Sequence, residues 1–414
     1  MAPSPAASAT RTTPRGWAVL LLNRLHYSSV VLSSFAFGLF LPFIQADLKL
    51  SYLEIGVLQG VWWATSALFL VPFSALLGRF DPNRRVLAAL ALLTPLVLTQ
   101  GLALGFWTLL ASRFLTVLTH AAMAPARPLL LRRWAAPQQY ATITSVGLSV
   151  HSTWMAATLT FSPLLIVALA SWRLAYFLQA SLLAIQLIIW AFITRNPPPP
   201  LEPEPPSPPA SENPNSALSL ISTLRAYPHA WLLGCIMLCL SASWTTVLTF
   251  LPTILETERG IAISAGSILF GFLYYALIPG APVGSRIFKY VTNRRLMVLL
   301  PAIFNTAFTV AALLSDNFTL AALALTGLGL VWVFVPAMEV LPFEFAGIAP
   351  RQVSMLTALV LTFSAVGFGA GPVLAGAVAQ AADSLTTGVL TVAALTSLGI
   401  MAATLFPPRP GALN

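Results

Sequence analysis

Three basic side chains recur at intervals of seven residues in one apolar stretch of the chain. Arg113, His120 and Arg127 lie in the sequence ASRFLTVLTHAAMAPARPLLLRRW, which covers residues 111–134. Seven residues are nearly two helical turns, so a helix would carry the three side chains in one stripe, with ~10 Å between neighbours. Guanidinium groups bind anions, and an imidazole with an ordinary pKa of about 6.5 suits proton transfer. We therefore expect the stripe to face a wet cavity rather than lipid.

Each residue of this stripe also has a structural interpretation. Arg113 could join neighbouring helices by hydrogen bonds, and His120 could be a satisfied interior histidine. Arg127 could extend its side chain to the membrane surface, beside Arg132 and Arg133.

Further candidates for substrate binding or proton relay lie in two other apolar segments. Arg24 and Tyr27 are three residues apart, on the same face of a helix, whereas His26 points elsewhere. His151 and Trp154 share a helix face in the same way, and core packing is the alternative interpretation for that pair.

The second half of the chain has its own candidates. Trp244 and Thr245 lie near the middle of an apolar segment, where a hydroxyl and an aromatic ring could orient a small polar solute. Hydroxyl side chains equally promote helix packing. Glu339 could pair with Arg24 or Arg127 when an inner gate closes, which would give a two-state element. An interfacial glutamate is the alternative.

The elements that position these residues are membrane helices. The chain has 414 residues, of which 57% are hydrophobic and 8% charged, against about 25% charged in a soluble domain. A membrane helix needs ~20 mostly apolar residues. Such spans are predicted at 17–44, 51–77, 86–104, 107–130, 139–168, 173–194, 227–255, 262–284, 296–315, 318–343, 352–380 and 385–406.

Charge in the loops predicts the orientation. Residues 1–16 are predicted to be disordered, residues 195–226 form a Pro-rich linker, and residues 407–414 form a tail. With these three segments in the cytoplasm, fifteen of the 21 Lys and Arg residues lie inside, and three lie outside, namely Lys49, Arg173 and Arg259. This bias follows the positive-inside rule. We expect a multi-pass protein of the inner (plasma) membrane with both termini in the cytoplasm.

The two halves of the chain resemble each other. FLPFIQADLKLSYLEIG begins at residue 40 and FLPTILETERGIAISAG at residue 250, and NRR occurs at 83–85 and again at 293–295. The shift is 210 residues in both cases. This constant shift predicts two six-helix bundles in parallel repeat, residues 17–194 and 227–406, a plan found in transporters that rock about a midplane site.

The residues between the second and third spans resemble a signature of the major facilitator superfamily, which has a glycine, three residues, Asp-Arg, a glycine and a basic pair. This chain reads SALLGRFDPNRR at 74–85, so Gly78 replaces the usual aspartate and Asp81 follows three residues later. The second copy, Gly284 to Arg295, has no acid. The resemblance implies a cytoplasmic gate, for which the candidate residues are Asp81, Arg84, Arg85, Arg127, Arg294, Arg295 and Glu339.

Two further family patterns are incomplete. Arg113 matches the arginine of Arg-x-x-x-Gly-x-Gly on the fourth helix, but Val117 and Thr119 replace the glycines. The fifth helix has Ser162-Pro163 where antiporters carry Gly-Pro. The resemblance implies that helices one, four, seven and ten line the central cavity, and it argues against drug–proton exchange.

The sign balance of the membrane helices favours an anionic substrate. We take Glu339 and Glu344 to be the only acids in the spans, and both lie near one surface. We expect a secondary transporter that moves a small anionic solute by alternating access, with proton coupling or with none. A multidrug or metabolite exporter and a non-transporting assembly factor or sensor are the alternatives.

Other partners are not expected. No phosphate-binding loop, nucleophile–base pair or metal cluster is evident, and Cys235 and Cys239 have neither disulfide nor zinc spacing. We therefore expect no enzyme activity, cofactor, metal or nucleic acid, and a monomer in the bilayer.

Overall fold

The structure is a computed structural model. It describes residues 11–35, 37–77, 80–123, 126–136, 139–169, 171–196, 225–261, 263–278, 283, 290–339, 341–345 and 350–408. Within these ranges every regular element is a helix. The prediction of an all-α fold is confirmed. Most of the predicted linker lies outside the described residues.

Every predicted span coincides with one or more helices. The N-terminal half contains α1 (Pro14–Phe35), α2 (Phe37–Leu48), α3 (Tyr52–Leu77), α4 (Pro82–Gly101), α5 (Phe106–Met123), α6 (Ala126–Trp134), α7 (Tyr140–Leu169) and α8 (Trp172–Ile193). The C-terminal half contains α10 (Pro228–Thr257), α11 (Ile263–Tyr275), α13 (Arg294–Leu314), α14 (Phe318–Val331), η2 (Trp332–Phe334), α15 (Val335–Glu339), η3 (Leu341–Glu344), α16 (Pro350–Ala382) and α17 (Leu385–Leu405).

Not every predicted span is one long helix. By length and apolar composition, five of the described helices could cross a membrane, and the bent pair of α1 and α2 could form a sixth span. The total of twelve spans therefore stays a prediction. The span predicted at 107–130 contains α5 and α6, and residues 124 and 125 between them lie outside the described residues.

Side-chain caps fix the start of matching helices in the two halves. Asp81 precedes α4 and accepts a hydrogen bond from the backbone N–H of Arg84 at 3.0 Å. Asn293 precedes α13 and accepts from the backbone N–H groups of Arg295 and Leu296. Each cap satisfies donors that a helix leaves free in its first turn.

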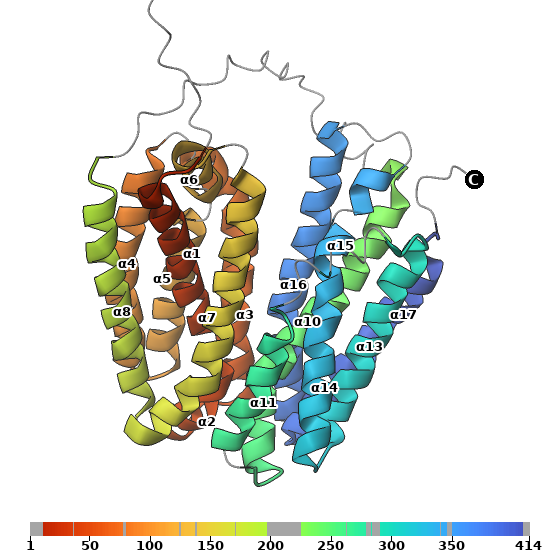
Figure 1. Cartoon of the computed structure of the whole chain (residues 1–414). Helices are drawn as coiled ribbons and strands as arrows, with labels where there is room; N and C mark the ends of the chain where they lie inside the picture. The colour runs from red at the N-terminus through yellow and green to blue at the C-terminus, as the bar shows by residue number, and fades with distance from the viewer. Residues whose placement is uncertain are drawn as a thin grey trace, which may run out of the picture.

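The two halves form separate bundles that meet at one end of the molecule. Figure 1 shows them in contact at the end near α2 and α11, and diverging towards the end near α6 and α15. The pairs α3–α16, α7–α11 and α2–α10 make contacts between the halves. The contact end is the one predicted to face outward, because the loops with Lys49 and Arg259 lie there. We call these contacts the outer seam.

Glycine allows the backbones to approach closely in the outer seam. A Cβ atom at Gly38 would lie 1.9 Å from the carbonyl oxygen of Leu248, and one at Gly56 would lie 2.4 Å from that of Pro372. Real Cβ atoms do not come this close to a carbonyl oxygen. Small residues commonly enable such packing between membrane helices.

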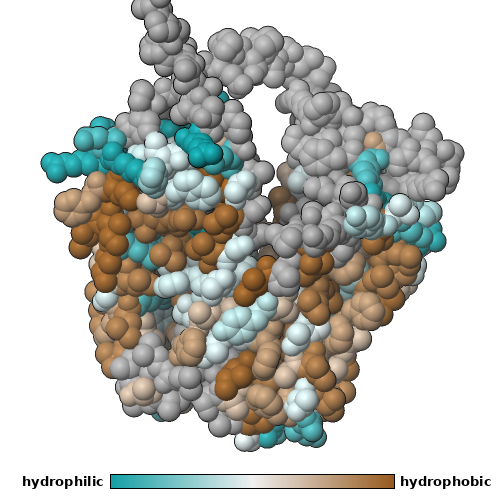
Figure 2. All heavy atoms as spheres, in the orientation of Figure 1, coloured by the Kyte–Doolittle hydropathy of each residue, from teal (hydrophilic) through white to brown (hydrophobic). Residues whose placement is uncertain are grey.

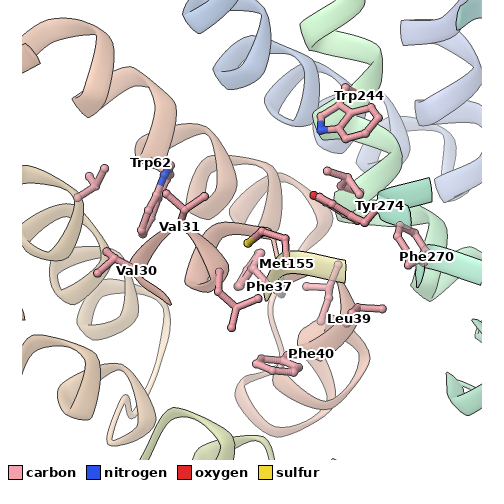
Figure 3. Packing of buried hydrophobic residues seen from close by; sticks show 14 of the residues in the cluster. Val30, Val31, Phe37, Leu39, Phe40, Trp62, Met155, Trp244, Phe270 and Tyr274 are labelled. Carbon is pink, nitrogen blue, oxygen red and sulfur yellow. The ribbon is translucent and has the colours of Figure 1, made fainter. Parts of the chain in front are cut away.

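Apolar residues lie both inside the bundles and on their outer surface. On the face seen in Figure 2, a broad hydrophobic band crosses both halves, with hydrophilic residues near its two ends. Trp107 is 76% exposed and Leu104 is 87% exposed, as expected for side chains that face lipid. The larger of two apolar clusters in the interior includes Trp62 from the N-terminal half and Trp244 from the C-terminal half, both labelled in Figure 3, and the second cluster lies within the C-terminal half. Packing is therefore continuous through the outer seam.

Candidate functional site

Tyr27 lies at the centre of a cluster of basic and aromatic side chains. The guanidinium carbon of Arg24 lies 5.3 Å from the centre of the Tyr27 ring, and that of Arg127 lies 5.4 Å from it. The ring centres of His120 and His151 are 4.9 and 5.9 Å from that of Tyr27. Side chains from α1, α5, α6 and α7 thus converge on one phenol ring. We call these five residues the Tyr27 cluster.

Hydrogen bonds orient two members of this cluster. The Nε of Arg24 donates to the carbonyl oxygen of Gly147 at 3.1 Å, which ties α1 to α7. The hydroxyl of Ser28 donates to the carbonyl oxygen of Arg24 and lies 2.8 Å from Nδ1 of His151. Because a hydroxyl has one proton, Ser28 accepts a hydrogen bond from His151, which places the imidazole proton on Nδ1.

Arg24 and Arg127 line a cavity of about 200 Å³ in the N-terminal half. Its walls come from α1, α6 and α7, and the lining residues are Leu20, Asn23, Arg24, Arg127, Leu131, Ile143, Thr144 and Gly147. Two positive groups and two neutral polar side chains therefore face a mostly apolar space.

Every acid of the N-terminal half is used elsewhere. The sequence from 17 to 194 contains three, namely Asp47, Glu54 and Asp81. Asp47 pairs with Arg173 at 2.8 Å, Glu54 accepts hydrogen bonds from the backbone N–H and the hydroxyl of Ser51, and Asp81 pairs with Arg133. No acid of this half is thus left to neutralise Arg24 or Arg127, and an anion in the cavity would supply the missing charge.

Arg113 lies away from this cavity and is completely buried. It donates to the carbonyl oxygen of Leu58 at 2.9 Å, to that of Ser33 at 3.2 Å and to Oε1 of Gln59 at 3.1 Å. Its guanidinium carbon also lies 4.2 Å from the centre of the Phe37 ring. These contacts join α5 to α1, α2 and α3, and a direct contact with substrate stays a prediction.

His120 and Trp154 each retain an unused polar group. His120 is 6% exposed, and its ring lies between those of Tyr27 and Trp62. Within the described part of the chain, Nε2 of His120 and Nε1 of Trp154 are buried and have no hydrogen-bond partner. Both could therefore bind a solute.

The candidates on α10 are packed into the C-terminal half. Trp244 is 3% exposed, and its ring centre lies 4.6 Å from that of Trp332 and 5.9 Å from that of Tyr274. Thr245 is completely buried and donates to the carbonyl oxygen of Ser241 at 3.0 Å. Neither belongs to the Tyr27 cluster.

The predicted gating residues of the N-terminal half bind to their own half. The pKa of the Asp81 carboxyl is lowered, because the backbone N–H of Arg84 and the guanidinium of Arg133 outweigh the opposing effect of partial burial. Arg85 donates from Nη1 to the carbonyl oxygen of Leu77 at 2.6 Å. The side chain of Arg84 is exposed. Gly78, which replaces the family aspartate, lies outside the described residues.

The corresponding residues of the C-terminal half behave in the same way. Arg294 binds Glu344 through two nitrogen atoms, at 2.7 and 2.5 Å. Arg295 donates to the carbonyl oxygen of Phe406 at 2.7 Å, which joins α13 to the end of α17. Glu339 ends α15, and its side chain lies outside the description, so its pairing with Arg24 or Arg127 stays a prediction.

The sequence analysis missed one acid and several structural partners. Glu256 lies in a membrane helix, because α10 continues to Thr257 and thus beyond the predicted end of the span. Its carboxylate is half-buried, and Oε2 has no hydrogen-bond partner in the described part. The spacing Gly56-x-x-x-Gly60 was a sequence signal for the outer seam, whereas nothing in the sequence pointed to Ser33 as a partner of Arg113.

Comparisons with known proteins agree with this architecture. The family model of the Major Facilitator Superfamily matches residues 26–347. Solved structures with the same fold include a bacterial homologue of the human lysosomal transporter Spinster, inward-facing and unoccupied, with 18% identity and a TM-score of 0.76 over 95% of this chain and 96% of that one. The occupied form of that homologue has 16% identity and a TM-score of 0.78 over 95% of this chain and 97% of that one.

The nucleoside transporter NupG is a further structural relative, with 11% identity and a TM-score of 0.73 over 95% of this chain and 99% of that one. Identities this low show the fold alone. The comparison with curated proteins gives no match. The family model covers most of the chain and agrees with the two helical bundles, so this chain belongs to the Major Facilitator Superfamily.

Proposed function

We propose that the protein is a secondary transporter that carries a small organic or inorganic anion across the inner (plasma) membrane by alternating access. The observation that carries this proposal is the pair of guanidinium groups of Arg24 and Arg127, which line one cavity in a half whose three acids are all paired elsewhere. A pair of positive charges that no acid of the same half neutralises is costly inside a membrane protein. A bound anion removes this cost and gains charge-assisted hydrogen bonds.

The contacts between the halves support a rocking motion. The outer seam is closed by backbone packing at Gly38 and Gly56, while the two bundles diverge at the opposite end (Figure 1). The cavity with Arg24 and Arg127 lies towards this diverging end, which is the predicted cytoplasmic end. The described conformation is therefore one in which the anion site would exchange with the cytoplasm, and separation of the seam would expose the site to the other side.

The Tyr27 cluster also supports coupling to protons. The rings of His120 and His151 both contact Tyr27, which lies beside the two arginine side chains. An imidazole beside an anion can take up a proton together with that anion. We propose symport with protons, for which the measurement is anion-dependent alkalinisation outside proteoliposomes. His120→Gln and His151→Gln should each weaken this signal more than they weaken anion exchange.

The direct test of the anion proposal is anion flux and binding in purified protein. In proteoliposomes, Arg24→Gln and Arg127→Gln should each reduce anion uptake by roughly 10- to 100-fold, the effect of one lost charge-assisted contact. Arg11→Gln is the matched control, because it removes the same charge from an exposed residue at the N-terminus. Uptake of cations but not anions, or unchanged uptake in both cavity variants, would exclude this function.

The orientation has its own test. We propose that both termini lie in the cytoplasm, as the distribution of Lys and Arg in the loops predicts. A single engineered cysteine in the loop after α2 should react with a membrane-impermeant maleimide in whole cells, whereas one near the N-terminus should react only after lysis. If instead the cysteine near the N-terminus reacts in whole cells and the one after α2 reacts only after lysis, the orientation is reversed. The described conformation would then be open to the outside.

A further inference from the structure

Asn23 presents an unused amide group to the cavity that Arg24 and Arg127 line. Its side chain comes from α1, is 5% exposed and forms part of the cavity wall. Within the described part of the chain, this side chain makes no hydrogen bond to another residue. Its amide therefore gains hydrogen bonds only from what the cavity holds. An amide both accepts and donates, so a hydroxyl group on a bound molecule would satisfy it in both ways.

The guanidinium groups on the same wall also have hydrogen-bond donors to spare. Arg24 donates from Nε to the carbonyl oxygen of Gly147 at 3.1 Å, whereas its terminal nitrogen atoms make no hydrogen bond to the described residues. Arg127 contacts the ring of Tyr27, with 5.4 Å from its guanidinium carbon to the ring centre, and likewise donates no hydrogen bond there. The planar fork of a guanidinium fits the two oxygen atoms of a carboxylate. The two arginine residues thus suit a carboxylate head.

The rest of the wall is apolar and limits the size of the ligand. Leu20, Leu131 and Ile143 contribute to it from α1, α6 and α7. The cavity volume of about 200 Å³ equals the space that roughly six water molecules occupy in the liquid. A short, branched aliphatic group fits this space, whereas a long chain or a ring system does not. A second carboxylate would have to face apolar side chains, which is costly.

The charges of the cavity decide between a hydroxyl and an ammonium group beside Asn23. Either group could donate a hydrogen bond to the amide oxygen. An ammonium group would lie near the two guanidinium groups and be repelled by them. The three acids of this half are held by partners elsewhere and do not compensate. A hydroxy acid is therefore favoured over an amino acid of the same shape.

We propose that the substrate is a short, branched 2-hydroxycarboxylate. Its carboxylate binds Arg24 and Arg127, its hydroxyl exchanges hydrogen bonds with the amide of Asn23, and its aliphatic group packs on the three apolar side chains of the wall. The hydroxyl belongs on the carbon next to the carboxylate, because Asn23 and Arg24 are neighbours on α1 and line the same cavity. This inference rests on the proposed anion transport, names its substrate class and makes Asn23 the residue that determines specificity.

The test is a binding series on the purified full-length protein, measured by calorimetry. The ligands are isovalerate, each enantiomer of 2-hydroxyisovalerate, valine and the dicarboxylate methylsuccinate. The first three compounds share one skeleton and differ only in the hydrogen, hydroxyl or ammonium group at the second carbon. We expect the better enantiomer of 2-hydroxyisovalerate to bind roughly 3- to 10-fold more tightly than isovalerate, the value of one net hydrogen bond. Valine should bind at least about tenfold more weakly than 2-hydroxyisovalerate, and methylsuccinate no more tightly.

Variants at Asn23 connect the preference to this residue. Asn23→Leu keeps a side chain of similar size without polar atoms, so it should abolish the preference for 2-hydroxyisovalerate and leave isovalerate binding within about twofold of wild type. Asn305→Leu is the matched control, because Asn305 on α13 is completely buried in the other half and its amide also lacks a partner in the described part. Asn23→Asp places a negative charge beside Arg24 and should weaken the binding of every anion while that of valine improves.

Gly147 allows a separate test of the size limit. A Cβ atom at this position would lie 3.6 Å from Cγ of Arg24, an ordinary contact. Gly147→Ala therefore reduces the cavity without a clash and keeps the carbonyl oxygen that orients Arg24. It should weaken binding of 2-hydroxyisovalerate at least about threefold more than binding of lactate, which carries a methyl group in place of the branched one. An unchanged ratio of the two affinities would overturn the inference.

The outcomes distinguish this inference from the proposed function. Equal affinities for isovalerate and 2-hydroxyisovalerate in the wild-type protein, or a difference that persists in Asn23→Leu, overturn the inference. Tighter binding of methylsuccinate overturns it in favour of a dianion. In each of these cases anion transport stands if binding still depends on Arg127. If none of these anions binds in a manner that Arg127→Gln weakens, both the inference and the proposed function fail.

Discussion

Arg113 allows a decisive test between a structural role and contact with substrate. The change Arg113→Met keeps an unbranched apolar side chain in the pocket formed by Phe37 and Trp62 but removes every N–H donor. Two acceptors then lose their partner, namely the carbonyl oxygen of Ser33, in the last turn of α1, and Oε1 of Gln59. The carbonyl oxygen of Leu58 also loses a donor but keeps its hydrogen bond within α3. These groups lie in the interior of the N-terminal half, where water does not replace the lost donors.

The magnitude follows from the two acceptors that are left without a donor. A buried acceptor without a partner costs about 1–3 kcal/mol, so even the lower limit gives a loss of about 2 kcal/mol. For a unit of the size of the N-terminal half, 1 kcal/mol shifts the melting temperature by roughly 2–4 °C. We therefore expect Arg113→Met to lower the melting temperature of the purified protein by at least roughly 4–8 °C.

The assay is thermal unfolding in detergent, combined with anion binding at a temperature at which the variant is folded. Arg113→Lys should fall between wild type and Arg113→Met, because an ammonium group restores some donors but not the planar fork of a guanidinium. The folded Arg113→Met protein should still bind anions within about threefold of wild type. An unchanged melting temperature together with a loss of anion binding would refute the structural role and place Arg113 at the substrate.

Three further predictions concern the seam, the cap of α4 and the N-terminus. Gly56→Ala places a methyl group 2.4 Å from the carbonyl oxygen of Pro372, which costs about 1–3 kcal/mol by overpacking. Distances between spin labels on α2 and α11 should therefore increase, as expected for an open seam. Unchanged distances would show that the outer seam accommodates the methyl group. The pKa of Asp81 is lowered in the folded protein. Ionised Asp81 therefore stabilises the fold at pH values above its pKa in the unfolded chain, about 3.9, and this contribution is lost as the pH falls through its pKa in the folded protein. Because the side chain of Asp81 is 32% exposed, this pH-dependent contribution to the free energy of unfolding should be below about 1 kcal/mol. Melting curves at several pH values should show it in the wild type and not in Asp81→Asn. Arg15 donates to the carbonyl oxygen of Ile193 at 2.8 Å, so Arg15→Ala should accelerate hydrogen exchange at the end of α8, and unchanged exchange would show that this contact is dispensable.

Patterns along the chain predicted the helices well, because long apolar runs and turn residues are local signals. Arg24 and Tyr27 were placed on one face from a spacing of three residues, and the structure brings their side chains together.

Contacts between distant segments could not be predicted in the same way. Arg113 was a candidate for substrate binding because it is a charge in an apolar span, but two of its acceptors are backbone carbonyl oxygens, which every residue has. The ring of Trp63 stacks on that of Phe368, although the two residues are about 300 positions apart in the chain. Such proximity depends on how the two bundles pack, for which a single sequence has no local signal.

Four ion pairs among the described residues each hold one half together. Asp47–Arg173 and Asp81–Arg133 belong to the first half, and Arg259–Asp316 and Arg294–Glu344 to the second, whereas the outer seam closes through glycine and backbone contacts. Dissolved salt weakens attraction between exposed charges but hardly affects close backbone packing. Ionic strength should therefore change the apparent affinity for an anion while leaving the rate of the conformational switch nearly constant. In a flux experiment, added salt would act on KM alone, which makes it a simple means of separating substrate recognition from movement.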